Sequence, residues 1–228
     1  MIRKKNVATF DVPGAYLYAG LPKQKFTLLK FQGKFVEIMC GVNPEYCKHV
    51  RFEKGVKVLY MRVLKTLYGM IESALLWYEC YITVLVDLGL TINPYDPCVA
   101  NNIIDGIQYT IAWYVDDNKL LYKDPKVVTT ILNKIEAKFP GLVITRGKEH
   151  TFLGIKFKFR DDQKVELDLV EYIKEAIDES SLCTDQEITS PHVTWLLKVN
   201  PKARKLDNKR KKTFHSIVQK LLWLAQRG

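Results

Sequence analysis

Two adjacent carboxylates, Asp116 and Asp117, are the residues of this sequence whose types and position most clearly suggest chemistry. They follow Tyr114 and Val115 at the end of a segment in which apolar residues recur at every second position, as in a half-buried strand. Because apolar residues resume at 120–122, the segment predicts a hairpin with the acidic pair at its tip. Carboxylate oxygens gathered there would suit a metal ion. The alternative is a plain turn, since Asp and Asn hydrogen-bond their own backbone in turns without a further role.

A third carboxylate, Asp11, ends another apolar segment at residues 7–10. If the two strand ends lie side by side, the three aspartates form one cluster, which like charges would destabilise unless cations neutralise them. No His or Cys adjoins these aspartates, and an oxygen-only ligand set favours a hard cation over zinc. We therefore expect magnesium, with manganese as the alternative. Two such ions about 3.5–4 Å apart would serve phosphoryl or nucleotidyl transfer.

The elements that must position these carboxylates are expected to form a small antiparallel sheet backed by helices, which is an α+β arrangement. Apolar residues spaced by three and four predict one long helix from Leu64 towards Leu88. A second helix is expected to begin after an Asp124 N-cap with proline at its first position, and to end at Pro140-Gly141. Both helices would cover one face of the sheet.

The C-terminal third of the chain predicts a further hairpin and two more helices. The expected elements are a strand at 152–160, a turn at 161–163, a returning strand at 165–169, and helices at 170–179 and 213–227. We place a domain boundary after Asp162, which divides residues 1–162 from residues 163–228.

The charge of the chain favours a partner made of phosphate. Thirty-five Lys and Arg against 25 Asp and Glu give a net charge of +10, and the pI is near 9.2. Basic residues crowd one stretch before the last expected helix, and four of them are expected to contact a nucleic-acid backbone: Lys209, Arg210, Lys211 and Lys212. The alternative is a solvated helix face, which is a common role for a run of charge.

Composition also excludes several classes of protein. A chain of 228 residues with 47% hydrophobic content is typical of a globular protein rather than a disordered one. Five cysteines without a Cys-x-x-Cys pair argue against a disulfide framework or a structural zinc site, and Cys40, Cys47 and His49 lack a fourth ligand. No apolar stretch reaches the length of a bilayer span and no signal segment opens the chain, so we expect an intracellular protein without a membrane partner.

Five short motifs occur in a fixed order along the chain. They are Asp11-Val-Pro-Gly-Ala-Tyr16-Leu, then Leu67-Tyr68-Gly69 with Ala74 and Trp77, Tyr114-Val-Asp-Asp117, Phe152-Leu-Gly-Ile155, and Phe214-His-Ser-Ile-Val with Leu222-Trp-Leu-Ala225. In these motifs and their spacing the sequence resembles the reverse transcriptase of copia-type LTR retrotransposons, and the resemblance runs from about Asn6 to the last residue. Any one motif is a weak signal, whereas five in the right order are specific.

The resemblance implies an RNA-directed DNA polymerase, which adds deoxynucleotides to a primer 3′ end. Residues 1–162 would form the palm of a right-hand polymerase fold, and residues 163–228 the connection to the thumb and part of it. The fingers would be largely missing, because they precede Asp11 in the family.

The resemblance also assigns roles to individual residues. Asp11 and Asp116 would hold two magnesium ions, and Asp117 would be the supporting carboxylate. Tyr16 would be a steric gate under the sugar of the incoming nucleotide, with Gly69 also at the nucleotide site; the alternative for Tyr16 is a core aromatic. The primer terminus would pack against Phe152, Leu153 and Gly154.

The resemblance implies that the chain binds dNTPs and an RNA or DNA template with its primer. It also implies an oligomer or an association with the remaining modules of the polyprotein. The expected location is the cytoplasm, within a virus-like particle, or the nucleus. One departure is the segment Met70-Ile71-Glu72-Ser73, where the family usually has Leu-Lys-Gln-Ala. Glu72 would place negative charge near the triphosphate. The charge of the chain and the missing fingers leave two alternatives. One is a catalytically inactive relic that only binds nucleic acid, and the other is a decayed coding sequence whose product folds poorly.

Overall fold

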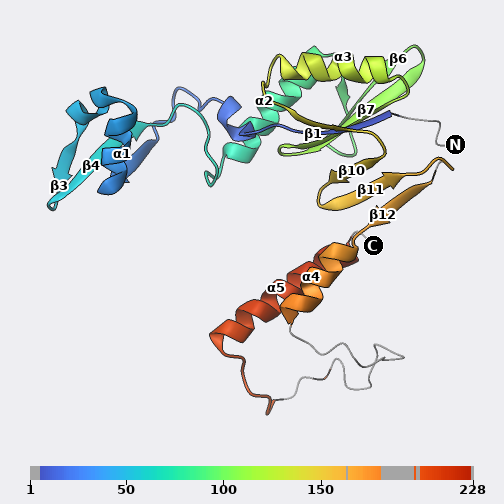
Figure 1. The fold of residues 1–228 in the computed structure, drawn as a ribbon. Coiled ribbons are helices and arrows are strands. Elements are labelled where there is room, and N and C mark those ends of the chain that lie inside the picture. The colour runs from blue at the N-terminus through green and yellow to red at the C-terminus, as the bar shows by residue number, and fades with distance from the viewer. Residues whose placement is uncertain (1–5, 163, 181–197, 199–200, 227–228) are drawn as a thin grey trace. The chain divides into compact units, whose positions relative to one another are not determined.

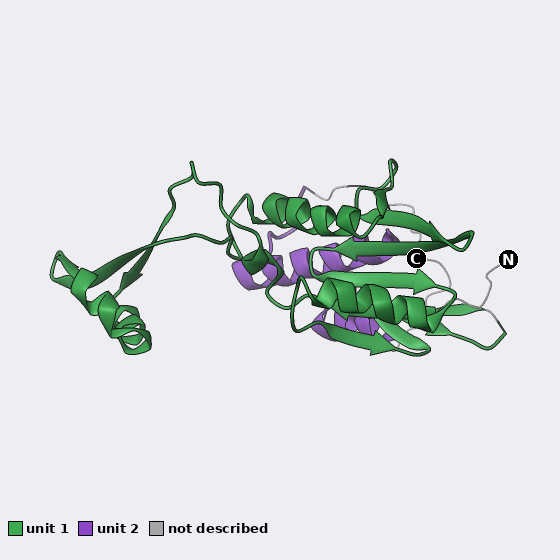
Figure 2. Cartoon of the chain, turned by 90° about the horizontal axis from the view of Figure 1, so that it is seen from above, with its two compact units in different colours: residues 1–166 green, residues 167–228 purple. Residues whose placement is uncertain are grey.

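The computed structural model describes residues 6–162, 164–180, 198 and 201–226 (Figure 1). The chain divides into two compact units, residues 1–166 (unit 1) and residues 167–228 (unit 2), shown in Figure 2. Among the described residues, no helix combines the length and the apolar character that crossing a bilayer requires.

The largest element of unit 1 is a six-stranded antiparallel sheet with the strand order β5-β6-β7-β8-β1-β9. Its strands are β1 (Asn6–Asp11), β5 (Thr91–Ile92), β6 (Val99–Ile104), β7 (Ile107–Tyr114), β8 (Asp117–Tyr122) and β9 (Val143–Arg146). Strands β7 and β8 form the predicted hairpin. Strand β1 pairs with β8 so that Asp11 lies opposite Asp117. The expected neighbourhood of the two strand ends is thereby confirmed.

Two helices, α2 (Ser73–Asp87) and α3 (Pro125–Glu136), pack on one face of this sheet (Figures 1 and 2). Strand β7 supplies Tyr109, Ile111 and Trp113 to the core between the layers, because alternate side chains of a strand point to the same face. The α+β arrangement with an antiparallel sheet backed by helices is confirmed.

Helix α2 is shorter than the sequence predicts, because it begins at Ser73 and not near Leu64. Gly69 has φ +92, and a residue in that conformation ends any right-handed helix. The Ser73 hydroxyl donates to the Leu67 carbonyl at 2.6 Å across the turn that precedes the helix. The apolar residues that suggested helical spacing are not a buried face, since Leu64 is 67% exposed and Ile71 is 99% exposed.

Helix α3 begins as predicted. The Asp124 side chain accepts the Lys126 N–H at 2.8 Å, and Pro125 occupies the first helical position, where its missing N–H costs no hydrogen bond. The helix ends at Glu136, four residues before the expected Pro140. There the Glu136 carboxylate accepts the Gly141 N–H at 2.9 Å and so closes the loop that follows.

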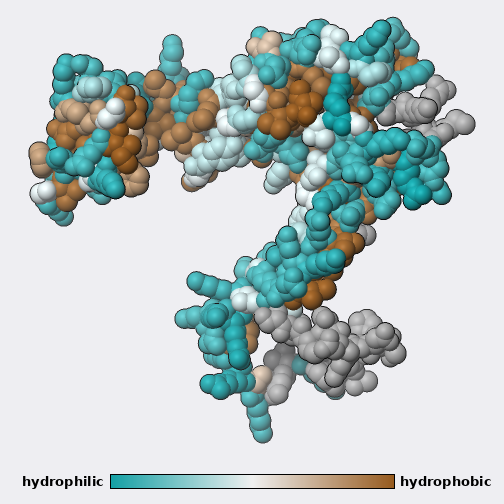
Figure 3. All heavy atoms as spheres, viewed as in Figure 1, coloured by the Kyte–Doolittle hydropathy of each residue, from teal (hydrophilic) through white to brown (hydrophobic). Residues whose placement is uncertain are grey.

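The segment between β1 and α2 contains a small lobe for which the sequence patterns made no prediction. Its elements are β2 (Leu28–Gln32), α1 (Lys34–Val42), η2 (Pro44–His49), β3 (Arg51–Glu53) and β4 (Val56–Arg62), with the strands in the order β2-β4-β3. The short helix η1 (Ala15–Tyr18) precedes the lobe and packs on α2 in the main core. Val36, Val58 and Leu59 are buried in the lobe, whereas Phe35 and Phe52 are 66% and 70% exposed. Figure 3 shows hydrophobic residues at the surface of this lobe.

A second three-stranded sheet consists of β10 (Glu149–Phe152), β11 (Ile155–Phe159) and β12 (Val165–Asp168). The sequence predicts one strand from Phe152 to Arg160, but Leu153 and Gly154 form a tight turn with φ +53 and +75. Phe152 therefore pairs with Ile155 across a two-residue hairpin. The expected return of the chain into β12 is confirmed, although Gln163 lies outside the described residues.

The described part of unit 2 contains helices α4 (Val170–Ser180) and α5 (Asn208–Ala225). The rings of Tyr172 and Trp223 lie 4.5 Å apart between them, and Lys220 pairs with Glu179 at 2.8 Å. Helix α5 begins five residues before the expected start, because the Asp207 side chain accepts the Arg210 N–H at 2.8 Å as an N-cap. The expected helical residue 227 lies outside the described part of the chain.

Candidate active site

The turn between β7 and β8 holds the two adjacent aspartates in a strained backbone. Tyr114 pairs with Asp117, which leaves Val115 and Asp116 as a two-residue turn. Val115 has φ +57, in the left-handed region that β-branched residues rarely adopt. Such strain persists only where the surroundings enforce it, and it is found most often at functional sites.

Hydrogen bonds from three elements hold this turn in place. The Trp77 indole N–H of α2 donates to the Val115 carbonyl at 2.7 Å. The Asp116 carbonyl accepts the Val12 N–H at 3.0 Å and the Asn118 amide at 2.6 Å. The backbone of Asp116 is therefore used by the fold, while its carboxylate takes no part in these bonds.

Asn118 extends this support into the core. It is fully buried, and its side-chain oxygen accepts the Tyr81 hydroxyl at 2.6 Å. The sequence pattern placed Asn118 in the turn, and the structure corrects this by making it the buried second residue of β8. The supporting roles of Tyr81 and Asn118 were not predicted. The one available signal was that Trp77 and Tyr81 lie four residues apart and so share a helix face.

The three aspartates meet at the ends of adjacent strands. Burial raises the pKa of Asp11, and repulsion from Asp116 and Asp117 raises it further. Burial also raises the pKa of Asp117, although the bond it accepts from the Leu153 N–H opposes that rise. Both shifts therefore reflect carboxylates that are partly shielded from water and close to one another.

Metal binding at this cluster rests on donor chemistry. Within the described ranges, no three His, Cys, Asp or Glu side chains are already arranged as ligands of one ion. The donor set nevertheless fits a hard divalent cation, because it consists of carboxylate oxygens whose mutual repulsion a cation would relieve. Asp117 differs from the other two, since its Oδ2 already accepts the Leu153 N–H at 2.6 Å.

Two tyrosines lie beside the carboxylates. The rings of Tyr16 and Tyr68 are 4.6 Å apart and tilted by 55°. Burial raises the pKa of Tyr68, and the neighbouring carboxylates of Asp116 and Asp11 raise it further. The Thr66 hydroxyl donates to the Tyr16 carbonyl and fixes its backbone. The sequence predicts Tyr68 to belong to a motif and to the long helix, and the structure instead adds it to the site next to Tyr16 and the adjoining Gly69.

The negative charge of Glu72 is compensated within the chain. Lys25 pairs with Glu72 at 2.6 Å, and this hydrogen bond lowers the pKa of the Glu72 carboxyl. Because the side chain of Lys25 is half exposed, the pair contributes little to stability. The effect of this ion pair is local. The Lys25 ammonium offsets the negative charge of Glu72, for which the sequence alone indicated no partner.

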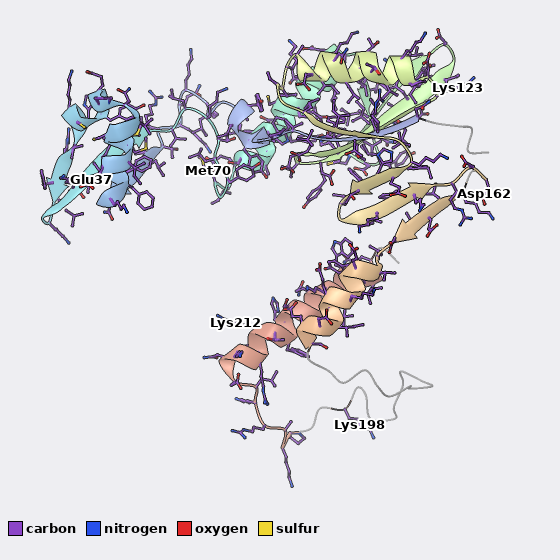
Figure 4. All side chains as sticks on the ribbon, viewed as in Figure 1. Glu37, Met70, Lys123, Asp162, Lys198 and Lys212 are labelled. Carbon is purple, nitrogen blue, oxygen red and sulfur yellow. The ribbon has the colours of Figure 1, made fainter. Side chains whose placement is uncertain are left out.

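The expected primer-contacting residues lie in the same unit as the aspartates, and the expected backbone-contacting residues do not. Phe152, Leu153 and Gly154 occupy the β10–β11 turn, which touches Asp117 through the Leu153 N–H. The basic residues Lys209 to Lys212 lie in α5 of unit 2, all exposed, and Figure 4 shows Lys212 on that helix. The structure thus joins the hairpin residues to the cluster and leaves the basic tract in unit 2.

A buried histidine connects β10 to β1, the strand next to the edge of the main sheet. His150 is 3% exposed, and its Nε2 lies 3.0 Å from the Gly147 carbonyl. Because a carbonyl only accepts, Nε2 carries the proton and Nδ1 accepts the Thr9 hydroxyl at 3.1 Å. Burial lowers the pKa of this histidine from 6.5.

This arrangement makes the stability of unit 1 depend on pH. With the folded pKa of His150 below the unfolded value of 6.5, stability is full above that value and falls as the pH drops through it towards the folded pKa. His150→Gln keeps a donor and an acceptor but cannot titrate. Thermal melts between about pH 7.5 and 5.5 should therefore show a smaller drop in Tm for this variant than for the wild type. His49→Gln, at an exposed histidine, is the control and should keep the wild-type slope; equal slopes for all three proteins would contradict the prediction.

The chain is thus an α+β protein in which carboxylates lie together at the ends of paired antiparallel strands. The family model described as "Reverse transcriptase (RNA-dependent DNA polymerase)" matches residues 46–194, which is more than half of the chain. The chain belongs to this reverse transcriptase family.

Curated relatives narrow the assignment. The chain is 24% identical over 177 residues to the Transposon Ty1-BR Gag-Pol polyprotein of Saccharomyces cerevisiae, covering 75% of this chain and 9% of the relative. It is 23% identical over 207 residues to the Transposon Ty1-BL Gag-Pol polyprotein of the same organism, covering 88% and 10%. These relatives confirm the copia-type family that the motifs indicate. The chain spans about a tenth of their length.

Solved structures that match this chain include a reverse transcriptase and a telomerase. One is the foamy viral protease-reverse transcriptase in complex with an RNA/DNA hybrid, with a TM-score of 0.40 and 15% identity, covering 78% of this chain and 19% of that chain. Another is apo telomerase from Candida tropicalis, with a TM-score of 0.39 and 11% identity, covering 74% and 33%.

Proposed function

We propose that this chain is the RNA-directed DNA polymerase domain of a copia-type retrotransposon and adds dNTPs to a primer 3′ end. The observation that carries the proposal is the pairing of Asp11 with Asp117, together with the Val12 N–H bond to the Asp116 carbonyl. These contacts gather three carboxylates at one end of the sheet in a chain of the reverse transcriptase family. Nucleotidyl transfer needs such a cluster of hard oxygen ligands.

In this proposal Asp11 and Asp116 would hold two divalent cations, magnesium or alternatively manganese. The cations, when bound, supply charge neutralisation at the triphosphate and activation of the primer 3′-hydroxyl. Within the described residues, no backbone N–H donates to either carboxylate, and Asp116 has the Tyr68 side chain as a hydrogen-bond partner. Asp117 acts as the supporting carboxylate and holds the β10–β11 turn through the Leu153 N–H.

The nucleotide would lie against the tyrosine wall beside the carboxylates. Tyr16, packed on Tyr68, would face the sugar of the incoming nucleotide, and its ring would exclude a 2′-hydroxyl. Gly69 has no side chain, which leaves room for the nucleotide beside this wall. Phe152, Leu153 and Gly154 would pack against the primer terminus from the neighbouring hairpin turn.

The larger assignments belong to the same proposal. Residues 1–162 would be the palm, and residues 163–228 the connection to the thumb and part of it. Lys209, Arg210, Lys211 and Lys212 would contact the backbone of an RNA or DNA template with its primer, which makes binding weaken with salt. The chain would act inside the cell, in a virus-like particle or the nucleus, as one module of a longer polyprotein or as an oligomer.

Single-nucleotide primer extension on an RNA template tests this proposal. The wild-type chain with magnesium and the templated dNTP should lengthen the primer by one nucleotide. A primer that ends in a dideoxynucleotide is the matched control, because it binds equally but lacks the attacking 3′-hydroxyl. Chelation of the cation should abolish the product. Primer–template that binds in a salt-dependent manner without being extended would instead establish the nucleic-acid-binding alternative.

A further inference from the structure

We propose that Lys119 is a positioning residue that seats the β10–β11 hairpin on the sheet and so fixes the Leu153–Gly154 turn beside Asp117. This inference rests on the proposed function, because it concerns how the hairpin would present a primer terminus. Lys119 acts through aromatic residues of the hairpin and does not itself touch the reacting atoms.

The side chain of Lys119 lies on the sheet face opposite the helices. On β8, Asn118, Leu120 and Tyr122 are buried on the helix side, where Asn118 bonds to Tyr81 of α2. Because strand side chains alternate, Asp117 and Lys119 emerge together on the other face. Lys119 is therefore two residues from the aspartate cluster on the same surface of the same strand.

Three aromatic rings of the hairpin surround the Lys119 ammonium. Its Nζ lies 3.7 Å from the centre of the Phe157 ring and 5.8 Å from the centres of Phe152 and Phe159. A cation over the face of an aromatic ring is attracted by the ring quadrupole, and more strongly where water is excluded. Within the described residues Lys119 forms no ion pair with a carboxylate, so its ammonium group interacts mainly with the three aromatic rings.

Two other anchors also hold the hairpin, one at the register of Lys119 and one two residues away at Asp117. In the first, His150 bonds to Thr9, the residue of β1 that pairs with Lys119. In the second, the Leu153 N–H bonds to Asp117, which pairs with Asp11. Because side chains alternate along β1 and β8, these contacts all lie on the same face of the main sheet. They hold the hairpin at two successive positions of that face.

The turn itself is shaped for this docking. Leu153 and Gly154 both have positive φ, the conformation of a tight two-residue hairpin turn, and Leu153 takes it despite its side chain. In this conformation the Leu153 N–H is directed at Asp117 Oδ2, 2.6 Å away. Phe152 directly precedes the turn and is also one of the three rings around Lys119. Lys119 therefore contacts one of the proposed primer-contacting residues directly.

Lys119→Met and Lys119→Arg separate a positioning role from simple packing. Methionine keeps an unbranched apolar stem without charge, whereas arginine keeps a cation that binds aromatic faces. We expect Lys119→Met to raise the KM for primer–template by about fivefold to tenfold, while the KM for dNTP changes less than about twofold. Lys119→Arg should restore the wild-type KM. The matched control is Lys123→Met, at an exposed lysine just beyond the end of β8 that is labelled in Figure 4.

A second measurement does not require polymerase activity. Amide hydrogen exchange at Leu153 should be faster in Lys119→Met by about fivefold to tenfold, with exchange at Ile111 in the sheet centre unchanged. Faster exchange at Leu153 without any primer extension by the wild type would support the positioning role and overturn only the proposed function. Unchanged exchange at Leu153, a KM for primer–template equal to that of the wild type, or failure of Lys119→Arg to rescue would each overturn the inference.

Discussion

Asp116→Asn is expected to lower the rate of primer extension by about a thousandfold or more while leaving the thermal stability of the chain nearly unchanged. The substitution keeps the shape of the side chain and removes a full negative charge from the proposed cation ligand set. The fold uses Asp116 through its carbonyl, which accepts bonds from Val12 and Asn118, and an asparagine presents the same carbonyl. Activity and stability should therefore separate at this residue.

Single-turnover extension and thermal melts of the same preparations measure both effects. Asp87→Asn, at an exposed residue that ends α2, is the matched control and should retain wild-type extension. Asp117→Asn should retain much more activity than Asp116→Asn, because an amide oxygen can still accept the Leu153 N–H. Extension by Asp116→Asn at the wild-type rate would show that this carboxylate is no part of the reaction.

Trp77→Ala is expected to lower the free energy of unfolding of unit 1 by about 3–5 kcal/mol. Trp77 is 2% exposed, and its ring packs within 5.3 Å of Tyr81 and 5.1 Å of Phe139. Removing the indole opens a cavity between α2 and the sheet, and it also deprives the Val115 carbonyl of its hydrogen-bond donor at 2.7 Å. The strained turn would then lose the contact that holds it against the helix.

Urea titration monitored by circular dichroism measures this loss. Leu75→Ala, at a residue of the same helix that is 59% exposed, is the control and should cost about 1 kcal/mol or less. Trp77→Phe should lie between the two, because it keeps part of the packing and loses the indole N–H. A Trp77→Ala midpoint equal to that of Leu75→Ala would refute the claim that this ring organises the core.

The sheet and the acidic turn could be predicted because the pattern that encodes them is local. Alternating apolar residues on both sides of Asp116 specify the β7–β8 hairpin, and a short apolar run ending in Asp11 specifies its neighbour. The N-cap at Asp124 could also be predicted, because Asp is favoured at the N-cap and Pro at the first helical position.

The start of α2 and the turn in the second hairpin could not be read in the same way. Leu64 and Ile71 have helical spacing but are exposed, so the apolar periodicity predicted a buried helix face that is absent at these residues. Leu153 has the same period-two spacing as Ile155 and Phe157 of β11, so the sequence gives no sign of the turn that its positive φ makes.

Contacts between distant residues account for the part of the site that the sequence did not reveal. Tyr81 and Asn118 are separated by 37 positions and meet only after α2 packs on the sheet. Lys119 could have been placed on the Asp117 face from period two, yet the rings around it belong to another sheet. Tyr68 adjoins the aspartates because the chain turns at Gly69, which a helical interpretation of that segment concealed.

The separation of backbone from side chain at Asp116 has a consequence for how such a sequence decays. A genomic copy that lost only this carboxylate would still produce a folded protein, because its main-chain bonds to Val12 and Asn118 do not depend on it. Under the proposed function, that product would retain the basic residues Lys209 to Lys212 and would compete with active copies for the same primer–template. A change at this position would therefore leave a folded competitor of the active protein, whereas a change at Trp77 would lower the stability of the fold itself.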